Sequence, residues 1–145
     1  MRPGLLVTAV VVMACCLVGL SASSSASVRV DVGHGLSISV PPGWRVSYRR
    51  FTPCSDRLER FSLIRGRQVL MLQERLDPVR AELVQRPARF SVRGKPSQME
   101  CCSVPGRTGW SLQFGDHGRG FYADLYPGDS PVTPLLQVLD SLQVT

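Results

Sequence analysis

The sequence predicts an α+β domain: a mainly antiparallel sheet of six or seven strands with two helices packed on it. Alternating apolar and polar residues recur in short runs between residues 28 and 126, which is typical of half-buried strands. Most of these runs are joined by short glycine-containing turns, so neighbours in sequence are expected to pair as hairpins. Aspartate or threonine followed by proline, at residues 77–78 and 133–134, is typical of helix starts.

The first strands are expected to form a hairpin. Residues 28–32 and 36–40 alternate with a period of two, and the Gly-His-Gly sequence at 33–35 supplies the turn. The Pro-Pro-Gly sequence at 41–43 then ends the strand, because proline cannot donate to a strand ladder. Alternation resumes over residues 44–48, which predicts a third strand.

The middle of the chain predicts two more strands and the first helix. Residues 61–64 and 69–72 flank a turn, and the second run is apolar throughout, as in a central strand covered on both faces. A helix is expected to begin at residues 77–78 and to end by Arg86, because Pro87 follows. Residues 88–92 are expected to add another strand.

The last third predicts a hairpin and the second helix. Residues 110–115 and 121–126 alternate on either side of a glycine-rich loop. Thr133 is expected to cap a helix that has Pro134 at its first position. The helix would present one apolar face to the sheet, made of Leu135, Leu136, Leu139 and Leu142.

The N-terminal residues predict export. Arg2 supplies one positive charge, residues 5–20 carry none, and residues 21–27 are small and polar. We therefore expect residues 1–26 to be a signal peptide or a membrane or lipid anchor, and residues 27–145 to be a single domain. The domain is expected outside the cytoplasm, either extracellular or associated with the cell envelope.

Three fates of the export segment fit the residues. Cleavage after Ala26 would release the domain. The sequence Val-Met-Ala-Cys at 12–15 looks like a lipobox, in which case Cys15 would carry a lipid. An uncleaved anchor is the third, although residues 5–20 are shorter than the ~20 residues of a usual spanning helix. The last two would hold the domain at a membrane.

The net charge of +6 favours contact with anionic surfaces or polymers. All of the 17 basic residues except Lys95 are arginines, and they are scattered along the chain. Nucleic-acid binding is not expected, because the chain has no basic arm and no alternation of aromatic and basic residues. A basic surface that simply faces solvent is the plainest interpretation.

The cysteines beyond the export segment predict a disulfide bond. Cys54 is expected to pair with Cys101 or Cys102, because thiols within reach oxidise outside the cytoplasm. A bond between the two adjacent cysteines would close a strained ring. No Cys-x-x-Cys occurs and no histidine stands at ligand spacing, so we expect neither a metal site nor a cofactor.

The loop that contains Asp116, His117 and Arg119 is the candidate ligand site. Arg119 could hold an anion, and His117 could combine with a serine and with Asp116 or Asp124 as a hydrolytic triad. No Gly-x-Ser-x-Gly elbow supports the triad, and no helix follows the loop to bind an anion with its N–H groups. Both His117 and His34 are therefore expected in ordinary hairpin turns, where histidine tolerates positive φ, and no catalytic residue is predicted.

Two stretches resemble the two ends of PsbP/Mog1-like domains. They are Leu-Ser-Ile-Ser-Val-Pro-Pro-Gly-Trp at 36–44 and Leu-Leu-Gln-Val-Leu-Asp-Ser-Leu at 135–142. The resemblance spans about residues 36–145, and this superfamily includes many small exported proteins and lipoproteins of actinobacteria. It implies a binding or accessory domain without known catalysis, and it assigns no site residues.

The expected function is that of a small exported or envelope-associated domain that binds a protein or envelope component and is not an enzyme. Two other functions stay open: a secreted hydrolase centred on residues 116–119, and a binder of anionic envelope polymers or lipid headgroups through surface arginines. A hydrolase needs a pocket where His117 meets a serine and a carboxylate. An anion binder needs basic side chains on one face, and its binding must weaken with salt. An accessory domain needs an exposed apolar patch.

Overall fold

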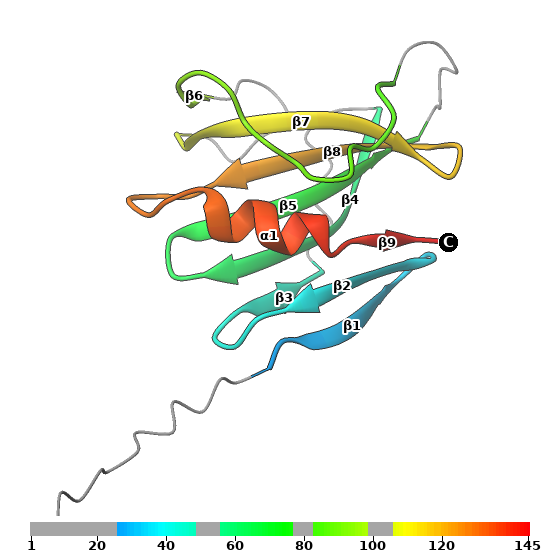
Figure 1. The fold of residues 1–145 in the computed structure, drawn as a ribbon, viewed down its shortest axis with the longest axis horizontal. Helices are drawn as coiled ribbons and strands as arrows, with labels where there is room; N and C mark the ends of the chain where they lie inside the picture. The colour runs from blue at the N-terminus through cyan, green and yellow to red at the C-terminus, as the bar shows by residue number, and fades with distance from the viewer. Residues whose placement is uncertain (1–25, 49–55, 77–82, 99–105) are drawn as a thin grey trace, which may run out of the picture.

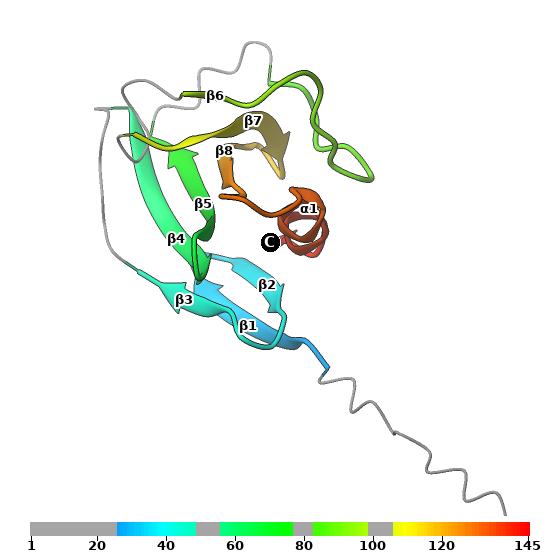
Figure 2. The ribbon, with the colours of Figure 1, turned by 90° about the vertical axis from the view of Figure 1, so that its left-hand side faces the viewer.

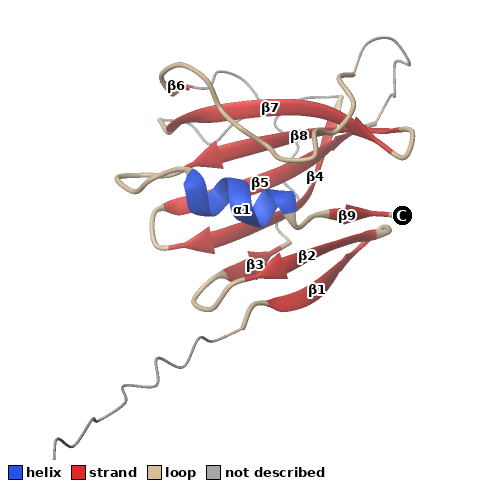
Figure 3. Ribbon diagram, viewed as in Figure 1, coloured by secondary structure: helices blue, strands red, loops and turns tan. Residues whose placement is uncertain are grey.

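The computed structural model describes residues 26–48, 56–76, 83–98 and 106–145. Within these ranges the chain forms two antiparallel sheets and one helix (Figures 1 and 3). The smaller sheet has the order β1-β2-β9, with bounds β1 (Val28–Gly33), β2 (Leu36–Val40) and β9 (Gln143–Val144). The larger has the order β3-β4-β5-β8-β7-β6, with bounds β3 (Arg45–Ser47), β4 (Arg57–Arg65), β5 (Gln68–Arg75), β6 (Ser97–Gln98), β7 (Thr108–Asp116) and β8 (Arg119–Tyr126). The helix is α1 (Thr133–Asp140).

The predicted hairpins are confirmed. β1 pairs with β2, β4 with β5, and β7 with β8, each in antiparallel register. The turn residues His34 and His117 have φ of 56° and 49°, the left-handed backbone that short hairpin turns require. β5 lies between β4 and β8 and its residues from Gln68 to Glu74 are buried, as its unbroken apolar run predicts.

The predicted fold class is wrong: the described residues do not form one sheet with two helices packed on it. The strands divide into two sheets because β2 takes the C-terminal strand β9 as its second partner, with Leu36 opposite Val144. The N–H of Thr145 also donates to the carbonyl of Gly35 at 2.9 Å. The turn at 41–43 therefore carries the chain from one sheet into the other.

The helix predicted before Pro87 is not present where the structure describes its end, at residues 83–86. There the chain is extended beside β7: the N–H of Gly115 donates to the carbonyl of Val84, and the N–H of Arg86 donates to the carbonyl of Gly115, both at 2.9 Å. Pairing with β7 thus replaces helical hydrogen bonds at residues 83–86, as tertiary contacts often override local propensity. The predicted start at residues 77–78 lies outside the described ranges. The strand expected at 88–92 is also absent.

The second helix is confirmed, with one correction at its start. The capping position is Val132 and makes no side-chain cap, so the predicted cap, Thr133, is instead the first helical residue. Leu135, Val138 and Leu139 are buried, and α1 contacts β2 and β5. Figure 2 shows α1 lying between the smaller sheet and the curved face of the larger one, where the core is.

Several predictions fall on residues outside the described ranges. These are the export segment with Cys15, and the disulfide between Cys54 and Cys101 or Cys102. Export, lipidation and the disulfide therefore stay predictions. In the ranges that the structure covers, no helix is long and apolar enough to cross a membrane.

Candidate functional site

The predicted ligand residue Arg119 is engaged in ion pairing at one end of the larger sheet. Its Nε and Nη2 donate to the two carboxylate oxygens of Glu74 at 2.7 and 2.9 Å, and its Nη1 donates to the carbonyl of His34 at 2.8 Å. Arg60 donates to the same carboxylate at 2.5 Å. Burial acts to raise the pKa of Glu74, but hydrogen bonds from Arg119 and Arg60 outweigh it and lower the pKa. Arg119 therefore links β8 to β5 and to the β1–β2 turn. Its guanidinium, the group expected to hold an anion, is engaged in these contacts.

Asp116 is engaged in the same way. Its two carboxylate oxygens contact Arg86 Nη1 at 3.0 Å and His117 Nδ1 at 2.6 Å. Burial opposes ionisation, yet hydrogen bonds from Arg86 and His117 lower the pKa of Asp116. Arg86 also donates to the carbonyl of Asp140, at the end of α1, at 3.0 Å. These contacts fasten residues 83–86 to β7 and α1.

The groups of the hypothetical triad do not meet in the described part of the chain. His117 is 66% exposed and its partner is Asp116, and no described serine hydroxyl bonds to it. A hollow of about 530 Å³ lies beside the loop, but its described lining contains no serine, threonine or cysteine. The structure thus brings Asp116, His117 and Arg119 into ion-paired contacts and places no nucleophile with them.

Asp124, the alternative triad acid, lies in a buried polar cluster of the larger sheet. Its side chain accepts a hydrogen bond from Gln73 Nε2 at 2.8 Å, and the residue is only 2% exposed. Burial raises the pKa of Asp124, although Ser111 and the charge of Arg57 oppose this. The Arg57 guanidinium stacks 3.5 Å from the ring centre of Tyr122. Among described residues no group of three or more His, Cys, Asp or Glu side chains could hold a metal ion.

A basic strap, residues 83–98, runs over β7 and toward α1 (Figures 1 and 2). It contains no acidic residue, and its side chains Arg89, Arg93 and Lys95 are exposed. No described carboxylate pairs with these three groups, in contrast to Arg86 at the start of the strap. The middle is held by Phe90, whose N–H donates to Asp140 at 2.7 Å and whose ring packs on Phe114, with ring centres 4.9 Å apart.

The sequence analysis does not single out the strap, because its arginines belong to a set of basic residues scattered along the chain. The sequence feature that indicates the strap is the run from residue 83 to residue 98, which contains four basic residues and no acidic one. In a strand Arg89, Arg93 and Lys95 would share one face, because side chains two residues apart point the same way. The segment lies on the surface and leaves the unpaired charges of Arg89, Arg93 and Lys95 accessible to solvent.

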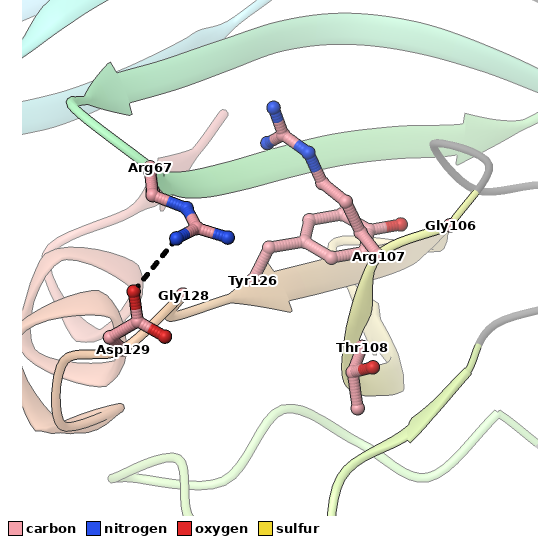
Figure 4. A pocket seen from close by; sticks show the side chains of 7 residues that line it. All are labelled: Arg67, Gly106, Arg107, Thr108, Tyr126, Gly128 and Asp129. Atoms are coloured by element: carbon pink, nitrogen blue, oxygen red, sulfur yellow. Dashed lines mark hydrogen bonds and ion pairs between the residues drawn. The ribbon is translucent and has the colours of Figure 1, made fainter.

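A second candidate is the Arg67–Arg107 pocket, a hollow of about 370 Å³ at the other end of the larger sheet (Figure 4). Its lining comes from the β4–β5 turn, the start of β7, and the end of β8 with the turn that follows. The residues are Arg67, Gly106, Arg107, Thr108, Tyr126, Gly128 and Asp129. Sequence reasoning did not find it, because the three connections are far apart along the chain.

Comparison with family models, with curated proteins and with solved structures finds no match to this chain. The resemblance to PsbP/Mog1-like domains therefore stays a prediction.

Proposed function

We propose that this chain is a small exported, non-catalytic domain that binds an anionic polymer of the cell envelope through the basic strap. One observation carries the proposal: Arg89, Arg93 and Lys95 are exposed along an irregular surface segment in which no acidic residue occurs. Lys95 stands six positions after Arg89, so the backbone spreads the charges over at most ~20 Å. A row of separated cations suits a chain of repeating anions better than it suits a single small ion.

A polymer fits the strap better than a lipid surface does. Proteins that lie on membranes insert large apolar side chains beside their basic residues. In the strap the one aromatic side chain, Phe90, is buried in the core, and the one large apolar side chain that is exposed is a valine, Val84. The strap also lies on the opposite side of the molecule from the start of β1 (Figure 1), so a domain held at a membrane by its N-terminal segment would direct the strap outward.

The accessory-domain alternative has less support in the described residues. Only four of their large apolar side chains are exposed: Val28, Tyr48, Leu76 and Val84. The hydrolase alternative lacks a nucleophile beside His117, as described above. Of the three alternatives, binding of an anion through the unpaired charges of the strap therefore has the most support.

Changing His117 to alanine separates the non-catalytic proposal from the hydrolase. Because the ring is mostly exposed and loses one hydrogen bond to Asp116, we expect the free energy of unfolding to fall by no more than ~1 kcal/mol and polymer binding to stay the same. Urea unfolding and a panel of ester and peptide substrates measure both. A hydrolytic activity that disappears in His117→Ala would mean that the chain is an enzyme.

Binding of the wild-type domain to inorganic polyphosphate and to poly-glutamate, followed across a range of salt concentrations, tests the proposed function. Counterion release predicts that log K falls with log salt with a slope of roughly −2 to −3 if three cations engage the polymer. Vesicles with and without anionic lipid serve as the comparison. Tighter binding to anionic vesicles than to either polymer would mean that the ligand is a membrane surface and not a polymer. The absence of any salt-sensitive binding would contradict the proposal.

A further inference from the structure

The Arg67–Arg107 pocket combines two guanidinium groups with a single carboxylate. Arg67 donates to Asp129 at 2.9 Å, and both side chains of this pair are more than 80% exposed. Ion pairs so open to water contribute little, so a competing anion can displace one partner at small cost. Arg107 has no carboxylate partner among the described residues. The pocket therefore carries a net positive charge.

The backbone brings the two arginines together. Gly128 has φ of 62°, and a Cβ atom there would lie 3.0 Å from Cβ of Arg67, so glycine lets the turn after β8 approach the β4–β5 turn closely. At the start of β7, a Cβ atom on Gly109 would lie 2.1 Å from the carbonyl oxygen of Leu125. Both close approaches depend on glycine, and together they set the position of the pocket walls.

The buried Tyr126 lines the pocket together with Arg67 and Arg107. In Figure 4 the Arg107 side chain extends upward from its strand. Thr108 points the other way, as expected for the neighbour of Arg107 on a strand. The Arg107 side chain therefore shares a face of the sheet with Tyr126, whereas the strap packs by Phe90 on the face that carries Phe114. The pocket thus lies on the opposite face from Phe90, although the last residue of the strap, Gln98, pairs with the pocket residue Thr108.

We infer that this pocket binds a small molecule through a single phosphate or carboxylate group held between Arg67 and Arg107. A guanidinium presents paired N–H donors in the geometry of an oxyanion, and two of them converging on one anion give charge-assisted hydrogen bonds. A volume of about 370 Å³ is within the range of small-molecule sites. This inference does not depend on the proposed polymer binding.

Titration of the labelled protein with inorganic phosphate and with acetate, against chloride at equal ionic strength, tests the site by NMR. We expect saturable shifts at Arg107 and Gly128, and binding at least ~10-fold weaker in Arg107→Gln, because a charge-assisted bond is lost. Arg45→Gln is the matched control: Arg45 is exposed, without a described carboxylate partner, and lies on β3. Saturation by phosphate alone would assign a phosphate ligand, and saturation by both ions would assign an oxyanion of either kind.

A second variant tests the role of Asp129. Removing its charge in Asp129→Asn frees Arg67 and should tighten phosphate binding roughly fivefold. Shifts no larger than those caused by chloride, or equal binding by Arg107→Gln and Arg45→Gln, would overturn the inference. Weaker binding in Asp129→Asn would also overturn it, because Arg67 would then not be available to the ligand.

Discussion

Replacing Glu74 with glutamine is expected to destabilise the fold by about 2–3 kcal/mol at pH 7. Its carboxylate is only 11% exposed and is shared by Arg60 and Arg119, so glutamine leaves two largely buried guanidinium groups without a counter-charge. This expected loss of stability is smaller than the usual cost of breaking a fully buried ion pair, because Glu74, Arg60 and Arg119 all keep some contact with water. Urea unfolding measures it. Asp129→Asn is the matched control, because it removes one negative charge from an exposed pair and should cost less than ~0.5 kcal/mol.

The same variant predicts a dependence on pH. Glu74 has a pKa below its ordinary value of 4.5 in the folded protein, so the stability that it contributes is present above about pH 4.5. This contribution is lost as the pH falls through the lowered folded pKa, because the carboxylate is then protonated. The difference between wild type and Glu74→Gln should therefore be largest at neutral pH and shrink below pH 4.5. An equal difference at pH 7 and at pH 3 would show that Glu74 acts by shape alone.

Neutralising the strap in the triple variant Arg89→Gln/Arg93→Gln/Lys95→Gln is expected to weaken binding of polyphosphate roughly 10- to 100-fold at moderate salt. The three side chains make no described ion pair or hydrogen bond, so the fold should be unchanged and the loss should come from charge alone. The slope of log K against log salt should fall toward zero. Fluorescence anisotropy of labelled polyphosphate measures both quantities.

The matched control is Arg45→Gln/Arg67→Gln/Arg107→Gln, which removes the same total charge from other places on the surface. It should retain most of the polymer affinity, since the strap is intact, while it loses the inferred small-oxyanion site. The strap variant should show the reverse pattern. Equal losses of polymer binding in the two triple variants would mean that only the net charge of +6 matters, and that the strap is not the site.

Elements with strong local signals could be predicted from the sequence. The hairpins follow from alternation and from turns such as that at His117, where glycine flanks a residue with positive φ. The spacing of the apolar residues likewise predicts which face of α1 is buried, and Leu135 and Leu139, one turn apart, are indeed buried. These features depend on neighbours a few residues apart, which is the range over which sequence patterns are informative.

What could not be predicted depends on contacts between distant segments. The division into two sheets follows from β9 pairing with β2, about a hundred residues earlier, and neither strand indicates its partner. Residues 83–86 follow β7 because Gly115 offers both backbone groups, so the chain is not helical up to Pro87 as the sequence predicts. The candidate loop was located correctly as a turn, but the engagement of Arg119 by Glu74 depends on β5 lying beside β8.

The most direct test of polymer binding by the basic strap is to map where polyphosphate binds, by amide chemical shifts of the labelled wild-type domain. The account predicts that the largest shifts fall at residues 88–96 and disappear at high salt, with little change around Asp116 and His117. Shifts centred on the loop at 116–119, or spread evenly over the surface, would contradict it.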